Sequence, residues 1–253
     1  MRFFIELSYN GKHFFGWQIQ KKVNTVEERL EYCLSKLLKT SINVVGAGRT
    51  DKGVHAKQMF AHFDYKKEIG NNFIDRLNVF LPKNIKVLNI FPVKKNIHAR
   101  FYAIKRTYKY YLTREKNPFN QDFSWYCFYP LNIQKMNIAS KKLMEYKDFS
   151  SFCKKKRTNK KENNICQIYH AYWSEHNNIL CFTIEGNRFL RSMVRAIIGT
   201  LIDVGRNKIS INEFVKIIEL KNTNFCRLIV PACGLFLTKI LYPEDIFYEK
   251  KFE

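Results

Sequence analysis

The first part of the chain alternates between segments with strand periodicity and segments with helix periodicity. Apolar side chains alternate in the former and recur every three or four residues in the latter, and Pro82 stops the second helix. The order is strand, helix, strand, strand, helix, strand, as in the ferredoxin-like split β-α-β unit. The segments are residues 3–9, 26–38, 42–46, 57–65, 74–81 and 85–91.

The first helix carries its own start signal. Thr25 and Glu28 have capping-box spacing, in which the Thr25 hydroxyl accepts from the Glu28 amide and the Glu28 carboxylate reaches back. The apolar residues behind this box share one helical face. They are Val26, Leu30, Cys33, Leu34, Leu37 and Leu38.

The rest of the chain has a similar order with longer insertions. We expect strands at residues 104–113, 166–174, 179–185 and 234–240, and helices at 133–144, 188–204 and 214–220. The two parts together predict an α+β fold with two ferredoxin-like halves, residues 1–101 and 102–253. Their mostly antiparallel sheets are expected side by side, with a cleft between them.

The charge of the chain indicates its class of partner. Its 44 Lys and Arg residues stand against 22 Asp and Glu, which gives a net charge of +22. A field of this size attracts polyanions, so nucleic acid is the leading partner class, although a bias in nucleotide composition can supply part of the lysine excess. The run from Lys154 to Lys161 fits either a solvated loop or an arm for a phosphate backbone.

The composition, the cysteines and the N-terminal segment indicate the class of protein and its compartment. A composition with 46% hydrophobic residues excludes wholesale disorder, and no apolar stretch is long enough for a membrane-spanning helix. Seven cysteines without a C-x-x-C pair favour reduced thiols, and Glu6 interrupts any apolar signal core. We therefore expect a cytoplasmic protein.

Residues 46–56 form the segment whose side chains are best suited to catalysis or ligand binding. Three glycines in eight positions predict a tightly folded loop between two strands, from which Arg49 and Asp51 project. Its spacing fits neither phosphate-binding glycine motif, and Asp51 with His55 lacks further metal ligands. Spacing alone favours an ordinary turn in which Asp51 caps a local amide.

Five segments in order change that interpretation. They are residues 15–18 (FGWQ), 48–55 (GRTDKGVH), 98–101 (HARF) followed by 106–110 (RTYKY), 148–152 (DFSSF) and 187–195 (NRFLRSMVR). Together they resemble the motifs of the tRNA pseudouridine synthase A (TruA) family. Lys52 departs from the pattern, because many members carry Ala at that position.

The resemblance implies an isomerase that converts uridine to pseudouridine at tRNA positions 38, 39 and 40, in the anticodon stem-loop. It implies that Asp51 is the catalytic aspartate and that no metal or cofactor takes part. It also implies a homodimer that binds tRNA. Residues 1–101 would carry the catalytic loop, and residues 102–253 would complete the cleft.

Three further site residues follow from the same resemblance. Tyr108 matches the tyrosine that stacks on the target base, and Arg195 matches a basic residue that pairs with the catalytic carboxylate. Arg49 would help to hold the base out of the helix. Each has a plainer alternative: Tyr108 as an ordinary strand aromatic, and Arg195 as a surface residue on the polar side of a helix that also carries Arg188.

Two other classes of function compete with the isomerase. A tRNA-binding protein without activity would keep the charge and lack the aspartate, whereas Asp51 is present. A nuclease or phosphoryl-transfer enzyme would need a cluster of acidic metal ligands, and the acids of this chain are scattered.

Overall fold

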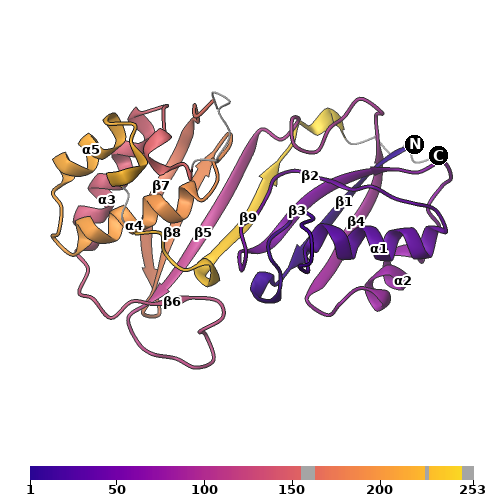
Figure 1. Cartoon of the computed structure of the whole chain (residues 1–253), viewed down its shortest axis with the longest axis horizontal. Coiled ribbons are helices and arrows are strands. Elements are labelled where there is room, and N and C mark those ends of the chain that lie inside the picture. Colours follow the sequence, from indigo (N-terminus) through magenta and orange to yellow (C-terminus); the bar gives the residue numbers. More distant parts are fainter. Residues whose placement is uncertain (155–162, 226–227, 247–253) are drawn as a thin grey trace. The chain divides into compact units, whose positions relative to one another are not determined.

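The computed structural model describes residues 1–154, 163–225 and 228–246. These residues form nine strands and five α-helices, a mixed α/β arrangement in which the strand pairs are mostly antiparallel (Figure 1). The chain divides into two compact units. Among the described residues, unit 1 comprises 1–104 and 237–246, and unit 2 comprises those between 105 and 236.

Unit 1 is built on a sheet with the strand order β4-β1-β3-β9, with β2 beside β3. Its elements are β1 (Arg2–Tyr9), α1 (Val26–Leu38), β2 (Val45–Gly46), β3 (His55–Asp64), α2 (Phe73–Phe80), β4 (Ile85–Val93) and most of β9 (Leu235–Leu241). Strand β1 is central and antiparallel to both neighbours, so that Phe4 lies opposite His62 on one side and Phe91 on the other. The predicted elements are confirmed here, although the second strand is only two residues long.

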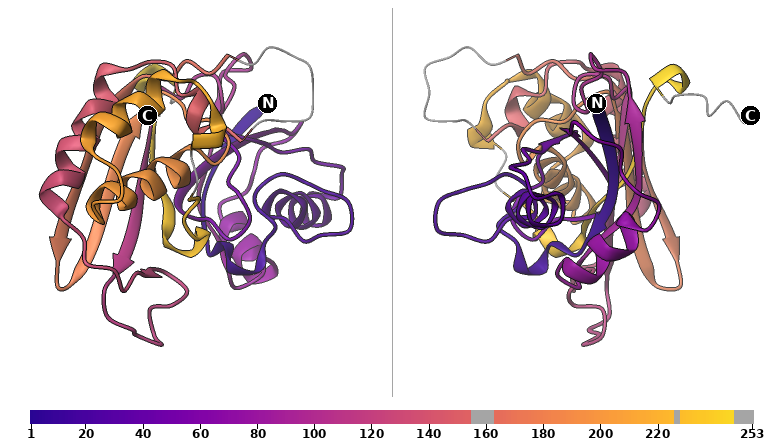
Figure 2. Two further views of the ribbon diagram at one scale, coloured as in Figure 1. Left: turned by 60° about the vertical axis from the view of Figure 1, so that its left-hand side comes forward. Right: turned by 90° about the vertical axis from the view of Figure 1, so that its right-hand side faces the viewer.

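Helix α1 begins where the capping signal predicts. The Thr25 hydroxyl accepts a hydrogen bond from the Glu28 amide at 3.4 Å, and the helix ends at Leu38, before Lys39, which has left-handed backbone angles. Val26, Leu30, Cys33 and Leu34 of its apolar face are buried, and α1 lies beside α2 with the Tyr32 ring stacked on Phe80 (Figures 1 and 2). The apolar stripe read from the sequence therefore fixes which side of α1 enters the core.

Unit 2 has the strand order β5-β8-β7, with three helices on one face of the sheet (Figures 1 and 2). Its elements are β5 (Lys105–Thr113), β6 (Trp125–Tyr126), α3 (Ile133–Lys142), β7 (Ile168–His176), β8 (Ile179–Gly186), α4 (Met193–Gly205) and α5 (Ile211–Glu219). The β7–β8 hairpin turns through Asn177 and Asn178, whose φ angles are 48° and 62°. Consecutive positive φ angles are typical of a type I′ turn, and Asn tolerates them.

The predicted helix over residues 188–204 is wrong at its start. Ser192 has a φ of 60° and a left-handed conformation, so α4 begins only at Met193. Arg188 and Arg191 therefore lie in the non-helical segment before α4, and helical phase does not place them. Helix α4 is buried on nearly all sides, including Gly199, whose added Cβ would lie 1.9 Å from the Leu228 carbonyl oxygen.

The last strand belongs largely to unit 1 even though it lies near the end of the chain. The Ile240 amide donates to Gln58 Oε1 at 2.9 Å, and the Ile104 amide donates to the Leu241 carbonyl at 2.8 Å. The sequence-based division at residues 101 and 102 left this strand with the second half. The hydrogen bonds of a strand are set by its neighbours in space, which the order of elements does not reveal.

Among the described residues, no helix combines the length and the apolar character that crossing a lipid bilayer requires.

Candidate active site

The loop that carries Asp51 connects β2 to β3 in unit 1. The Ala47 amide donates to the Phe60 carbonyl at 2.8 Å, and the Val54 amide donates to the Asp51 carbonyl at 3.1 Å, which closes a tight turn. Asp51 is half-buried, whereas Arg49 is exposed. The structure thus brings the predicted Arg49 and Asp51 to the same turn and leaves both side chains at the surface of unit 1.

The FGWQ segment lies directly against this loop and supports it. The Trp17 amide donates to the Thr50 carbonyl at 3.2 Å, and the Gly53 amide donates to the Phe14 carbonyl at 3.3 Å. Gly16 has a φ of 90°, and a Cβ at this position would lie 2.4 Å from the Thr50 carbonyl oxygen. Only glycine permits both this angle and this approach. The FGWQ and GRTDKGVH motifs therefore pack against each other and support one another.

Trp17 extends the support to the first turn of α1. Its buried indole donates from Nε1 to Glu27 Oε1 at 3.1 Å, and Glu27 Oε2 accepts from the Ile19 amide at 2.9 Å. A Cβ on Gly46 would lie 2.5 Å from Trp17 Nε1, so this glycine makes room for the indole. Sequence reasoning missed Glu27, because a Glu in the first turn of a helix also fits simple dipole stabilisation.

Residues on both sides of Asp51 are tied to the end of β1. The Tyr9 hydroxyl lies 2.8 Å from Thr50 Oγ1, with both side chains buried. His55 is buried as well, and its Nδ1 accepts from the Gly11 amide at 3.1 Å. This bond keeps Nδ1 unprotonated, which agrees with a structural role for His55. Tyr9 was not singled out from the sequence, although a hydroxyl-bearing ring at the end of an apolar strand is a usable signal.

Lys52, the departure from the family pattern, has a partner in the FGWQ segment. Its Nζ lies 3.9 Å from the centre of the Phe15 ring. An ammonium over an aromatic face is a favourable cation–π arrangement. The substitution of Lys for Ala is thus accommodated on the outside of the loop.

In unit 2 the RTYKY and NRFLRSMVR motifs come together. The half-buried Tyr108 ring meets Phe189 edge to face, with ring centres 5.2 Å apart, and Arg106 Nη1 donates to the Asn187 carbonyl at 2.6 Å. A Cβ on Gly186 would lie 3.2 Å from Phe189 Cζ, so the glycine leaves room for that ring. Phe189 therefore sets the position of Tyr108.

Arg195 lies in the first turn of α4. Its Nε donates to the Val230 carbonyl at 2.7 Å, and its side chain is half-buried. A guanidinium that donates to a fixed carbonyl keeps its orientation. Arg195 is therefore held in place and is not a freely solvated surface residue.

The DFSSF motif has a structural part in unit 2. Phe149 and Phe152 are fully buried, and the Ser151 hydroxyl donates to the Ile217 carbonyl at 2.5 Å and accepts from the Asn222 amide at 3.0 Å. The segment thus joins α5 to the core. After it, the Lys154 amide donates to the Arg191 carbonyl at 3.2 Å, and residues 155–161 of the basic run lie outside the described residues.

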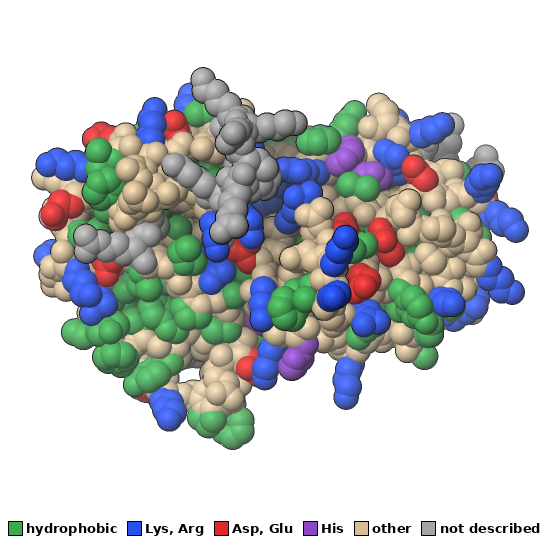
Figure 3. Space-filling model, in the orientation of Figure 1, with side chains coloured by type: hydrophobic (Ala, Val, Ile, Leu, Met, Phe, Trp, Pro, Cys, Tyr) green, Lys and Arg blue, Asp and Glu red, His purple; other side chains and the backbone are tan. Residues whose placement is uncertain are grey.

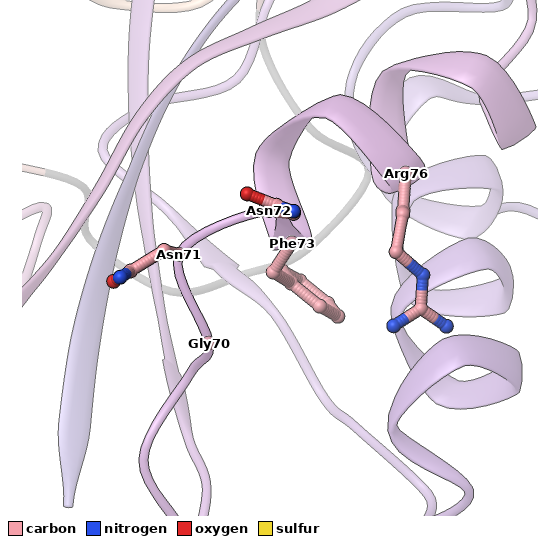
Figure 4. Close-up of a pocket in the computed structure, with 5 residues that line it drawn as sticks. All are labelled: Gly70, Asn71, Asn72, Phe73 and Arg76. Atoms are coloured by element: carbon pink, nitrogen blue, oxygen red, sulfur yellow. The ribbon is translucent and has the colours of Figure 1, made fainter.

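The surface outside these motifs carries basic side chains and a pocket. Lys and Arg side chains are spread over the face drawn in Figure 3. An open pocket lies at the start of α2, lined by Gly70, Asn71, Asn72, Phe73 and Arg76 (Figure 4), none of which is a predicted site residue. Within residues 1–154, 163–225 and 228–246, no group of three His, Cys, Asp or Glu side chains could hold a metal ion.

Comparison with known proteins places these motifs in one family. The family model described as tRNA pseudouridine synthase matches residues 7–102 and 139–243. A tRNA pseudouridine synthase A from Azobacteroides pseudotrichonymphae is 51% identical over 97% of this chain and 98% of that protein. The enzymes of the same name from Parabacteroides distasonis and Bacteroides fragilis are 48% and 46% identical, each over 97% of this chain and 98% of their own length.

Proposed function

The chain belongs to the tRNA pseudouridine synthase family, and from that premise we propose that it isomerises uridine to pseudouridine at positions 38, 39 and 40 of the anticodon stem-loop. The observation that carries the proposal is the GRTDKGVH loop, which presents Asp51 and is supported by the FGWQ segment. The net charge of +22 supports a polyanionic substrate.

We propose Asp51 as the catalytic residue. The reaction breaks the bond between C1′ and N1, turns the uracil, joins C1′ to C5, and returns the C5 proton to solvent while N1 gains one. A carboxylate promotes this by attacking C1′ or C6, or by removing the 2′ proton to give a glycal-type intermediate. A half-buried carboxylate at the surface of a tight turn has the access that each route requires.

The proposed substrate-binding residues are Tyr108, Arg49 and Arg195. Tyr108 stacks on the extruded uracil, which returns part of the few kcal/mol that unstacking costs. The exposed Arg49 holds the base out of the helix, and Arg195 pairs with the Asp51 carboxylate. The fixed positions of Tyr108 against Phe189 and of Arg195 on Val230 support these roles.

The wider architecture is proposed from the family resemblance. We infer two ferredoxin-like halves with the site in a cleft between them: a catalytic subdomain of residues 1–101, to which β9 adds a strand, and a completing subdomain formed by the rest of residues 102–253. The order β4-β1-β3 and the antiparallel pairing of unit 1 support the first half. We also propose a cytoplasmic homodimer whose partner is tRNA.

The experiment that tests this function is carbodiimide primer-extension mapping of an unmodified tRNA after incubation with the purified protein. Stops in the anticodon stem-loop are expected with the wild type, and Asp51→Ala should give none. The variant should bind tRNA with an affinity close to that of the wild type, because the carboxylate acts in the chemical step.

The other outcomes separate the competing functions. Tight binding without stops would indicate a tRNA-binding protein, and stops elsewhere in the tRNA would keep the chemistry and overturn the proposed positions. Activity that EDTA abolishes with a folded RNA would favour a metal-dependent enzyme. If Asp51→Ala loses as much affinity as rate, the role of Asp51 is misassigned.

A further inference from the structure

The HARF segment has no role in the function proposed above, yet it exposes an aromatic ring. Phe101 is 75% exposed, although Ile97 before the segment and Ala99 within it are buried. A single exposed apolar residue is ordinary by itself. What distinguishes Phe101 is the way its backbone is held.

Three side chains from separate parts of unit 1 anchor the segment. Arg2 Nη1 donates to the Ile97 carbonyl at 2.9 Å, His62 Nδ1 accepts from the Ala99 amide at 3.2 Å, and the Tyr242 hydroxyl donates to the Ala99 carbonyl at 2.5 Å. Arg2 is itself fixed by two 2.9 Å bonds to the Asp64 carboxylate. Anchors from β1, β3 and the chain after β9 hold the backbone rigid beside Phe101.

The side chains of the segment form a small aromatic platform. The His98 ring centre lies 4.3 Å from that of Phe101 and 4.8 Å from that of His62, so a row of rings leads from the core to the surface. The Arg100 guanidinium lies 5.9 Å from the Phe101 ring. An aromatic face next to a guanidinium is the combination on which unpaired nucleobases stack.

Cationic side chains gather at the same end of the sheet. Arg2 lies opposite Asp64 on β3 and opposite Val93 on β4, so both strands leave the sheet next to the anchored segment. The chain after each exit carries exposed lysines, Lys66 and Lys67 in one and Lys94 and Lys95 in the other, and Glu68 is the acid that follows the first pair. The platform is thus flanked by positive charge that complements a phosphate backbone.

We propose that this platform is a second RNA-binding site, in which Phe101 stacks on an unpaired base of the tRNA while the flanking lysines contact neighbouring phosphates. The inference rests on the proposed function for its substrate. The stacked base is not the target uridine, because His62 is seven residues along β3 from His55, a span of about 23 Å for an extended strand. The platform positions the tRNA and takes no part in the chemistry.

The test compares Phe101→Ala and Phe101→Trp with the wild type on unmodified tRNA. Loss of one base stack predicts a Kd and a KM about 5- to 150-fold higher for Phe101→Ala, with kcat unchanged at saturating tRNA. Phe101→Trp restores binding, because a larger ring keeps the stack. Val79→Ala is the matched control, since Val79 is 89% exposed on α2 of the same unit, and its Kd should equal that of the wild type.

The outcomes separate this inference from the proposed function. If the wild type forms no pseudouridine, the proposed function fails whatever Phe101 does. If the wild type is active and Phe101→Ala keeps the wild-type Kd and KM, the platform does not bind RNA and a protein partner becomes its alternative occupant. If Phe101→Ala weakens tRNA binding and Phe101→Trp weakens it as much, base stacking on Phe101 would also be overturned.

Discussion

The Tyr9 hydroxyl and Thr50 Oγ1 lie 2.8 Å apart inside unit 1, and this contact ties the end of β1 to the residue before Asp51. Thr50 also receives the Trp17 amide on its backbone carbonyl. The position of Asp51 is therefore set from its N-terminal side by two elements that lie far away in the sequence. Catalytic geometry depends on such supporting contacts as much as on the reacting group.

Removal of the Tyr9 hydroxyl should test this support. We expect Tyr9→Phe to lower the free energy of unfolding by about 1–3 kcal/mol, because Thr50 loses a buried partner. It should also reduce kcat, because the Asp51 turn gains freedom. Ser151→Ala is the matched control, since it deletes a buried hydroxyl from the core of unit 2. Equal kcat values for the two variants would show that Tyr9 supports only the fold.

Two glycines at the loop that carries Asp51, Gly16 and Gly48, should respond differently to the same substitution. Gly16→Ala meets the Thr50 carbonyl at 2.4 Å with a φ of 90°, so we expect a loss of more than about 2 kcal/mol in unfolding free energy. Gly48→Ala meets nothing within 4 Å and should change stability by less than about 0.5 kcal/mol. Thermal unfolding of both variants measures the difference. Similar melting temperatures would contradict the close packing of the FGWQ segment.

His62 should make stability depend on pH. Burial, and then the charges of Arg2 and His98, lower its pKa from 6.5 to about 4, while Asp64 opposes the shift. Because the folded pKa lies below the unfolded one, the stabilisation is complete above pH 6.5 and is lost as the pH falls toward 4. Its full size is about 3 kcal/mol.

Urea unfolding between pH 7.5 and 4.5 measures this effect. The wild type should keep its stability down to about pH 6.5 and lose it below that pH, and His62→Gln should lose less of it. Any pH dependence of stability that remains in the variant comes from other groups. One of these is His98, because burial also lowers its pKa. Identical slopes for the two proteins would show that His62 has the same pKa in the folded and the unfolded state.

Binding of tRNA should be dominated by phosphate contacts. The net charge of +22 predicts that log Kd rises with log salt concentration by about 0.7–0.9 for each phosphate neutralised. Titrations at several salt concentrations give this slope directly. A flat response would mean that base and shape contacts supply the affinity.

The sequence predicts local structure well because the signals are local. The cap at Thr25, the apolar stripe of α1 and the strand β1 each depend on a few neighbouring residues, and the structure contains all three, although Phe3, Phe4 and Ile5 are buried in succession and do not alternate. The helix prediction fails at Ser192, where one left-handed residue delays the start of α4 to Met193. The apolar periodicity of the sequence continues across this break and so does not reveal it.

The site residues follow the same division. Asp51, Arg49, Tyr108 and Arg195 were singled out by their motifs, and their roles stay predictions. Their surroundings came only from the structure: Tyr9 and Glu27 at the Asp51 loop, and Phe189 at Tyr108. Motifs name residues, whereas the contacts that hold them join segments that periodicity does not relate.

The amino-acid sequence by itself determined the family, the charge, the order of the elements and the chemistry available at Asp51. Tertiary structure alone decided that FGWQ supports GRTDKGVH, that the strand from Leu237 belongs to unit 1, and that three distant side chains anchor the backbone beside Phe101. The physical reason is one of range. Propensities and caps act over a few residues, whereas packing and hydrogen bonds between distant segments form only when the whole chain is folded.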